Sequence, residues 1–182
     1  EIDLMVYFFS EESLDGRDIQ IMFRVDDHWG LEEEMLKGFK YKFLKNHSPR
    51  PSYLRPFFGL MNFGVVRQIR REKPDAVILM GWSNVSWWLA IITSWLSRIP
   101  FLYMTDANVQ AEGLKSRLKL TPKRLLMSKL LFKFASGFLC AGTSNRDLYS
   151  LYGVPDRKLV QFAYSWDYDS FQENADRLRA EK

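Results

Sequence analysis

The sequence has little of the chemistry on which small metal or redox centres depend. Its 182 residues include one cysteine, Cys140, so no disulfide can form within the chain, and a lone thiol suits a reducing compartment. The two histidines, His28 and His47, share no metal-ligand spacing, and Asp26-Asp27-His28 resembles a metal cluster only superficially. We therefore expect no metal and a cytoplasmic location.

Long apolar runs are also missing. The longest candidate, residues 85–104, is interrupted by Ser94, Ser97, Arg98 and Pro100, and a membrane span needs about 20 consecutive apolar residues. We interpret this stretch as a buried helix followed by a strand, and we expect a protein that is soluble or at most peripheral on a membrane. No G-x-G-x-x-G follows a predicted strand, which argues against a plain dinucleotide-binding domain.

The composition that is present suits one α/β domain with a large core. Hydrophobic residues make up 47% of the chain and aromatic residues 15%, so disorder is not expected. The net charge of +4 is mildly basic. That balance alone does not separate nucleic acid, anionic lipid or phosphorylated substrates as partners.

Short apolar runs alternate with segments of helical periodicity over most of the chain. Residues 28–56 are irregular and predict loops and short elements, while the alternation elsewhere favours a doubly wound, mainly parallel sheet. The predicted strands are residues 2–9, 19–25, 76–80, 101–104, 138–141 and 159–162. The predicted helices are residues 58–72, 84–99, 122–135 and 145–152.

Several local patterns sharpen these predictions. Residues 76–80 are apolar on both faces, as is typical of a central parallel strand. Ser83 is expected to cap the next helix, and Ser144 to Asp147 have capping-box spacing. The core face of the helix after Ser83 is predicted to carry Val85, Leu89, Ile92 and Leu96, with Trp87, Trp88 and Trp95 buried beside them.

Four motifs occur in a fixed order between residues 73 and 171. They are KPDAVILMGW at residues 73–82, RIPFLYMTD at 98–106, FLCAGT at 138–143, and GVPDRKL from 153 followed by Tyr164, Asp167 and Phe171. Together they resemble the N-terminal domain of family 4 glycosyltransferases. The likeness covers about half the chain, and residues 1–50 match only in strand content.

The resemblance implies a fold and an activity. The fold is Rossmann-like, one half of a GT-B glycosyltransferase, with residues 1–171 as the acceptor-side domain and 172–182 as a tail towards a C-terminal domain. Relative to the family we expect the first strand and the C-terminal donor-binding domain to be missing, so that this chain alone is inactive. The implied reaction transfers a sugar from a nucleotide sugar to a glycan or lipid-linked acceptor, with retention, as in polysaccharide biosynthesis, and needs no cofactor.

Three polar loops follow predicted strands directly and are the candidate site. They are residues 81–84, 105–108 and 142–145, and ligands of open α/β sheets bind at the carboxyl ends of strands. The resemblance places Asp106 beside the acceptor hydroxyl and the reacting sugar carbon, where a carboxylate can accept a proton or stabilise positive charge. A turn or helix cap would explain the same aspartate.

The remaining loop residues have similar alternatives. Ser83, Asn84 and Asn108 are predicted to hydrogen-bond an acceptor, and Trp82 to stack on it; a cap and a core position explain Ser83 and Trp82 equally well. Gly81 is also predicted to contact the acceptor. Gly142 and Thr143 form the predicted cleft loop, and an ordinary strand-to-helix turn also favours glycine at position 142.

Residues 113–146 contain no Asp or Glu. Within them Lys123, Arg124, Lys129 and Lys133 accompany an apolar stripe of Leu126, Leu130 and Phe134, which is the pattern of a helix on an anionic membrane. A surface helix whose stripe packs on the sheet is the alternative. The rival function is a non-catalytic, membrane-associated subunit that recruits a separate donor-binding half; a nucleic-acid module ranks lower because the basic residues lie on a helix beside leucines.

Overall fold

The computed structural model describes residues 2–10, 36, 38–52, 55, 57–107, 129–163, 172 and 179. The chain divides into two compact units. The first comprises Glu1–Met104 and Leu120–Phe138, and the second comprises Thr105–Lys119 and Leu139–Lys182. The predicted strand at residues 19–25 lies outside the described residues, as does the beginning of the predicted helix at 122–135.

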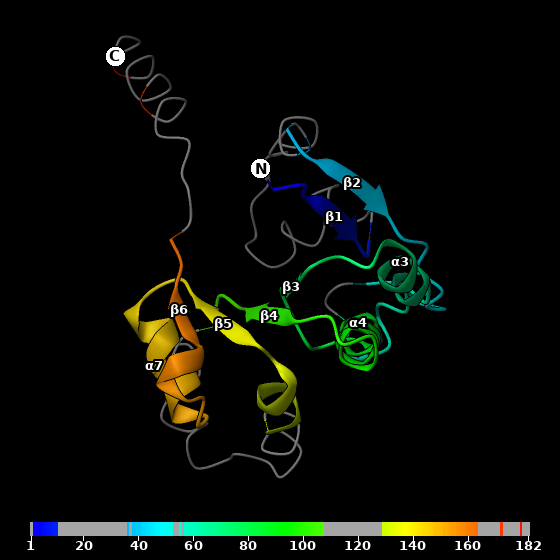
Figure 1. Ribbon diagram of the computed structural model, residues 1–182. Coiled ribbons are helices and arrows are strands. Elements are labelled where there is room, and N and C mark those ends of the chain that lie inside the picture. Colours follow the sequence, from blue (N-terminus) through cyan, green and yellow to red (C-terminus); the bar gives the residue numbers. More distant parts are fainter. Residues whose placement is uncertain are drawn as a thin grey trace. The chain divides into compact units, whose positions relative to one another are not determined.

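Strands and helices alternate along the chain, as the periodicity predicts (Figure 1). Residues 129–134 are also helical. No helix in the described part of the chain is both long enough and apolar enough to cross a membrane. The labelled elements are β1 (Met5–Phe8), β2 (Lys40–Phe43), α3 (Gly64–Glu72), β3 (Val77–Leu79), α4 (Val85–Leu96), β4 (Phe101–Met104), β5 (Gly137–Cys140), α7 (Thr143–Leu151), the 3-10 helix η1 (Asp156–Lys158) and β6 (Leu159–Gln161).

The ladders of the first unit are parallel, which confirms the predicted α/β class. β1 pairs with β2, and β3 pairs with β4. β2 corrects the prediction of an irregular segment, because Lys40-Tyr41-Lys42-Phe43 alternates polar and aromatic residues as a half-exposed strand does. The Phe8 and Phe43 rings stack at a centroid distance of 5.1 Å and so fix the pairing of the two strands.

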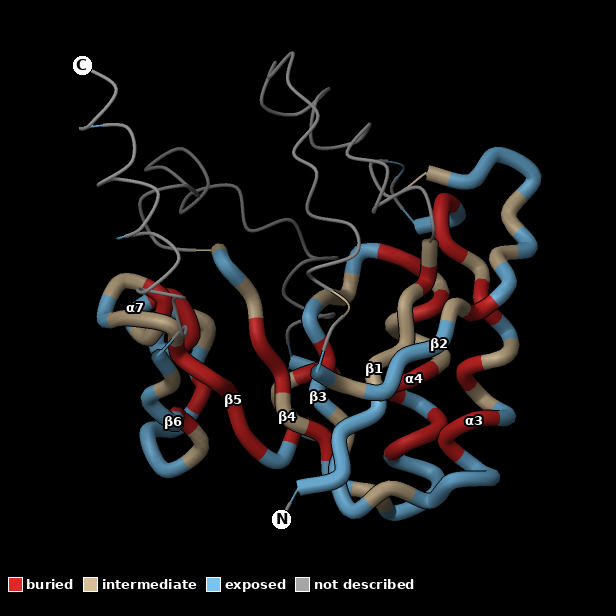
Figure 2. The backbone as a smooth tube through the Cα atoms, turned by 90° about the horizontal axis from the view of Figure 1, so that it is seen from above, coloured by how far each residue is buried: buried red, intermediate tan, exposed pale blue. Residues whose placement is uncertain are grey.

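The position of β3 differs from the prediction. The strand order is β3-β4-β5-β6, so among the described strands β3 stands at an end of its sheet and not at the centre. Ile78 and Met80 are 52% and 55% exposed. An apolar run shows that a strand is hydrophobic, but it does not show whether one or two strands pair with it. The fully buried strand is β5, which Figure 2 shows buried along its whole length.

Helix α3 begins later than predicted. Its first residue is Gly64. The N–H groups of Met61 and Asn62 are bonded to the side chains of Asn46 and Ser86 and so are not used in a helix. The end of α3 agrees with the prediction. Lys73 adopts a left-handed conformation with φ 44°, and its N–H donates to the carbonyl of Ile69.

Helix α4 presents a different face to the core from the one predicted. The buried residues include Ser86, Ala90, Thr93 and Ser94, which recur at helical spacing. α4 packs against α3, and its buried side chains other than Ile91 are small. The bulky residues Ile92, Trp95 and Leu96 are exposed.

One buried amide joins the strand ends of the first unit to α4. The Asn62 side chain is 0% exposed, and its Nδ2 donates to the carbonyls of Phe9 and Leu44, at 2.9 and 2.6 Å. Those residues directly follow β1 and β2. The Ser86 hydroxyl donates to Asn62 Oδ1 at 2.7 Å and accepts from the Asn62 N–H at 2.8 Å. The ends of β1 and β2 therefore meet the first turn of α4 at this side chain.

In the second unit α7 begins without a side-chain cap. Gly142 occupies the N-cap position, so the predicted capping box at residues 144–147 is not used. The helix ends as predicted near Gly153, whose φ is 83°. The Arg146 guanidinium donates to Asp156 at 2.5 Å and so links α7 to η1.

Replacing Asn62 with alanine should cost about 2 to 4 kcal/mol of unfolding free energy, because two buried carbonyls and a buried hydroxyl lose their partner. Urea unfolding followed by circular dichroism measures this. Asn46→Ala is the matched control, since Asn46 also bonds the backbone but lies where water can replace it. A loss for Asn62→Ala no larger than for the control would contradict the role of the buried amide.

Candidate functional site

The predicted site residues fall into both units. Gly81 to Asn84 belong to the first unit, and Asp106, Gly142 and Thr143 belong to the second. The convergence of the three loops stays a prediction. Asn108, Lys123 and Arg124 lie outside the described residues.

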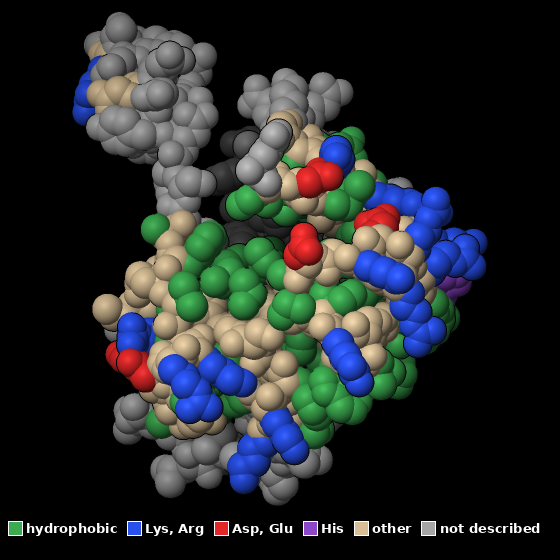
Figure 3. Space-filling model, viewed as in Figure 1, with side chains coloured by type: hydrophobic (Ala, Val, Ile, Leu, Met, Phe, Trp, Pro, Cys, Tyr) green, Lys and Arg blue, Asp and Glu red, His purple; other side chains and the backbone are tan. Residues whose placement is uncertain are grey.

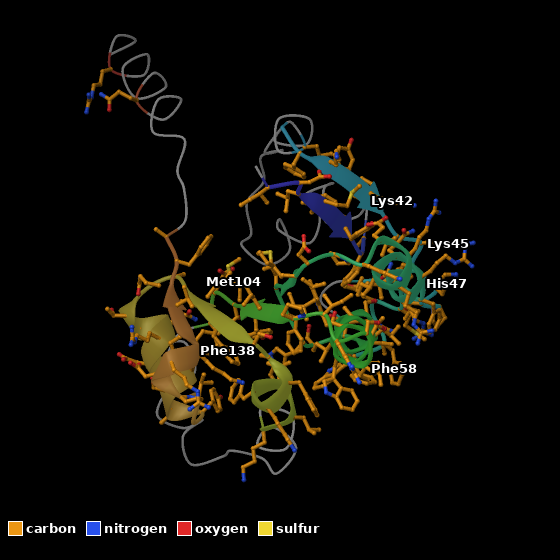
Figure 4. The ribbon with its side chains drawn as sticks, viewed as in Figure 1. Lys42, Lys45, His47, Phe58, Met104 and Phe138 are labelled. Carbon is orange, nitrogen blue, oxygen red and sulfur yellow. The ribbon has the colours of Figure 1, made fainter. Side chains whose placement is uncertain are left out.

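Asp106 follows a buried strand and lies in an exposed loop. β4 ends at Met104, labelled in Figure 4, and the chain then runs through Thr105, Asp106 and Ala107. Asp106 is exposed, whereas its two neighbours are half-buried. The Thr105 hydroxyl accepts the N–H of Ala107 at 3.3 Å, which tightens the turn at Asp106. A carboxylate at such a strand end can reach a ligand that approaches from solvent.

The loop at Asp106 is held by Asn145 of α7, a residue that sequence reasoning assigned to a capping box. Its Nδ2 donates to the carbonyl of Thr105 at 3.0 Å and to that of Ala107 at 2.6 Å. Its Oδ1 accepts the N–H of Ala141 at 3.3 Å. Asn145 therefore clamps the backbone on both sides of Asp106. An asparagine soon after a strand-to-helix glycine was the available signal, but the sequence does not show which carbonyls the amide meets.

Gly142 and Thr143 begin α7. The φ of Gly142 is −179°, an extended conformation open to any residue, and a Cβ placed there would meet nothing within 4 Å. Packing among the described residues therefore does not require glycine at this position. Thr143 is exposed.

Just before the loop, burial raises the pKa of the Cys140 thiol above its ordinary value, so Cys140 is the buried hydrophobe that the sequence predicts.

Gly81 has a structural reason of its own. A Cβ at Gly81 would lie 2.8 Å from Nε1 of Trp87, too close for a carbon atom. The next residue, Trp82, is half-buried, and its carbonyl accepts from the indole N–H of Trp88 at 2.9 Å. The indoles of Trp87 and Trp88 thus hold this loop, while Trp95, also predicted to be buried, is 51% exposed.

Ser83 and Asn84 play different parts. Asn84, and not Ser83, occupies the N-cap of α4, and it is fully buried. Its Nδ2 donates to the carbonyl of Arg55 at 2.8 Å, and its Oδ1 accepts from the Ser83 hydroxyl at 2.8 Å. These bonds give Asn84 a structural role in the described fold. Ser83 is exposed and is the member of this loop best placed to meet a ligand.

The described part of the basic segment is helical and exposes its cations. Lys129 and Lys133 are both exposed, and Lys133 Nζ lies 6.0 Å from the centroid of the Phe134 ring. Leu130, predicted to belong to a stripe with Phe134, is 42% exposed, whereas Leu131 is buried. The helix therefore packs through Leu131 and leaves the face of Leu130 open.

Among the described residues, no group of three or more His, Cys, Asp or Glu side chains could hold a metal ion.

Comparison with solved structures supports the fold. The chain is similar to the crystal structure of Anabaena Alr3699/HepE in complex with UDP and glucose, with a TM-score of 0.54 and 14% identity. The match covers 100% of this chain and 50% of that one, so the chain spans half the length of its structural neighbour. No family model matches the sequence, and no curated protein matches it. The fold is therefore Rossmann-like and fits one half of a GT-B fold.

The two glycines make a matched pair of tests. Gly81→Ala should lower the unfolding free energy by about 1 to 3 kcal/mol, because its methyl group would overlap the Trp87 indole. Gly142→Ala should leave stability within about 0.5 kcal/mol, because its methyl group enters open space. Denaturant unfolding measures both changes. Equal destabilisation by the two substitutions would show that the packing at these loops is not as described.

Proposed function

We propose that this chain is the acceptor-binding half of a glycosyltransferase that moves a sugar from a nucleotide sugar to a glycan or lipid-linked acceptor, with retention. The observation that carries the proposal is Asp106, an exposed carboxylate at the end of β4 whose loop is clamped by the buried Asn145. The structural neighbour, a protein in complex with UDP and glucose, supports glycosyl transfer as the reaction type.

The geometry of the Asp106 loop suits acceptor chemistry. A carboxylate held at a fixed backbone position can accept the proton of a sugar hydroxyl or stabilise positive charge on the reacting carbon. Asn145 acts as a positioning residue, because it fixes the carbonyls on either side of Asp106. The exposed Thr143, in the same unit as Asp106, is proposed to orient the acceptor, and the roles of Ser83 and Trp82 of the first unit stay predictions.

The donor is proposed to bind mainly to a domain outside this chain. The described loops offer the acceptor a carboxylate and hydroxyls, and a nucleotide diphosphate instead needs several donors arranged around its leaving group. The substrate assignment therefore places the acceptor on this half and the nucleotide sugar on the other.

Asp106→Asn should lower the transfer rate by about 100-fold or more in the longest natural protein that contains this chain, because an amide cannot accept the proton. Transfer of labelled sugar from UDP- and GDP-sugars to lipid and oligosaccharide acceptors is the assay. Asp75 is an exposed acid beyond α3, and Asp75→Asn is the control, with an expected transfer rate close to that of the unaltered protein.

Undiminished transfer by Asp106→Asn would show that another residue carries the chemistry. Calorimetric titration of residues 1–182 with the same donors tests the assignment of the half, and we expect weak binding. Micromolar affinity of this chain for a nucleotide sugar would assign it to the donor side.

A second candidate function is a non-catalytic subunit that lies on the anionic face of a cytoplasmic membrane, and a specific patch favours it. α4 exposes Trp95, whose ring lies 4.8 Å from that of Phe134. Lys129 and Lys133 stand on the same helical segment as Phe134. Apolar side chains beside lysines suit the interface of an anionic bilayer, which accepts aromatic rings and attracts cations. The exposed apolar members of this patch are Ile92, Trp95, Leu96 and Leu130.

Charge reversal by Lys129→Glu and Lys133→Glu should weaken binding to anionic vesicles by about tenfold or more, since each cation near such a surface contributes about 1 kcal/mol. Co-sedimentation with phosphatidylglycerol vesicles measures this. The matched control pair is Arg70→Glu and Arg71→Glu on α3, which should weaken vesicle binding less. Equal binding of the unaltered chain to neutral vesicles would contradict the electrostatic part of this proposal.

A further inference from the structure

Positive charge is concentrated in one stretch of the first unit. Residues 36–71 contain four lysines, five arginines and no Asp or Glu. Because the whole chain has a net charge of +4, this stretch contributes +9 and the other residues together carry −5. The described cations of the stretch are all exposed: Lys40, Lys42, Lys45, Arg50, Arg55, Arg67, Arg70 and Arg71.

Of the described acids of the first unit, one pairs with a cation of this stretch and one bonds outside it. Asp3 accepts from Lys40 at 2.7 Å, and Glu72 accepts from the Tyr7 hydroxyl. That bond and the burial of the phenol raise the pKa of Tyr7, burial being the larger cause. The third described acid of the first unit, Asp75, lies beyond the end of α3. Among the described residues, the cations of this stretch other than Lys40 are exposed and form no ion pair with an acid.

Aromatic rings are exposed among these cations. Phe58 is 62% exposed and Phe63 is 49% exposed. Phe58 makes an edge contact with Phe57 at 4.9 Å, and Phe63 packs on the ring of His47 at 5.5 Å. Figure 4 labels Lys45, His47 and Phe58 on one flank, where Figure 3 shows Lys and Arg side chains beside hydrophobic ones. We call Lys45, His47, Arg50, Phe58 and Phe63 the aromatic–cationic face.

The loop that carries this face is fixed in place. Asn46 accepts the N–H of Met61 at 2.9 Å and donates to the carbonyl of Gly59 at 3.0 Å. The Ser48 hydroxyl donates to the carbonyl of Phe58 at 2.6 Å. Gly59 has no room for a side chain, because a Cβ there would clash with the carbonyl oxygen of Ser52. A loop held this way presents its rings without a large ordering cost on binding.

One residue of the loop is strained. Phe57 has a φ of 60°, which is unfavourable for a bulky residue, and it is held there by two backbone bonds. Its N–H donates to the carbonyl of Ser83 at 2.9 Å, and its carbonyl accepts the N–H of Val85 at 2.9 Å. The loop therefore docks on the segment that follows β3, and it also begins directly after β2. Carboxyl ends of strands are where open α/β sheets bind ligands.

We propose that the aromatic–cationic face binds an acidic saccharide, with carboxylate or phosphate groups paired to Lys45 and Arg50 and a sugar ring stacked on Phe58. The proposal rests on the proposed function, because it makes this saccharide the acceptor or part of it. Flat exposed rings flanked by cations match an anionic sugar polymer in both shape and charge. A membrane is disfavoured because the rings are interleaved with charges and do not form a continuous apolar face, as they do beside Trp95.

The test is calorimetric titration of the chain with oligogalacturonate, with a neutral malto-oligosaccharide as the reference ligand. We expect saturable binding of the acidic saccharide and at least tenfold weaker binding by Lys45→Gln with Arg50→Gln. Phe58→Ala, which changes no charge, should also weaken binding about tenfold. The matched control is Arg98→Gln with Arg157→Gln, which removes the same charge from other exposed positions and should leave the affinity within about twofold.

Equal weakening by both charge pairs, or an unchanged affinity of Phe58→Ala in a chain with native circular dichroism, would overturn the proposal. So would stronger binding of this face to anionic vesicles or single-stranded nucleic acid than to oligogalacturonate. The result is separable from the transfer assay. If transfer depends on Asp106 but the chain does not bind the acidic saccharide, this inference alone is wrong. If the saccharide binds but no transfer occurs, the proposed function is wrong.

Discussion

The first unit depends on the burial of a few side-chain amides that have no water to replace their partners. The Asn62 side chain hydrogen-bonds two backbone carbonyls and one hydroxyl. Asn84 joins the loop around Arg55 to the start of α4. Such bonds are directional, so they fix where the chain leaves β2 and where α4 starts more narrowly than hydrophobic contact does. Asn145 uses the same device in the second unit, at the loop of Asp106.

Local sequence signals predicted the elements that depend on nearby residues. The alternation of strand and helix, the end of α3 at Lys73 and the buried Cys140 are confirmed, because periodicity, left-handed caps and short apolar runs are local properties. Among the described residues, the predictions of a central position for β3 and of the buried face of α4 were wrong. Both depend on which partner packs alongside, and an isolated segment does not carry that information.

The candidate site divides along the same line. The place of Asp106 and of the loops directly after strands could be predicted from the sequence, because the carboxyl end of a strand is visible there as a change from apolar to polar residues. The role of Asp106 was taken from the family resemblance and stays a prediction. The reasons for individual residues could not be found in this way. Gly81 is small because Trp87 lies over it, while Gly142 has open space around it, and the two look alike in sequence.

The single buried thiol has a practical consequence. Because burial disfavours the thiolate of Cys140, cysteines introduced at exposed positions would react with maleimide probes far faster than the native one. The natural chain is thus already suited to site-specific spin or dye labelling. One label in each compact unit would allow the separation of the two units, and its change on ligand binding, to be measured in solution without removing any native residue.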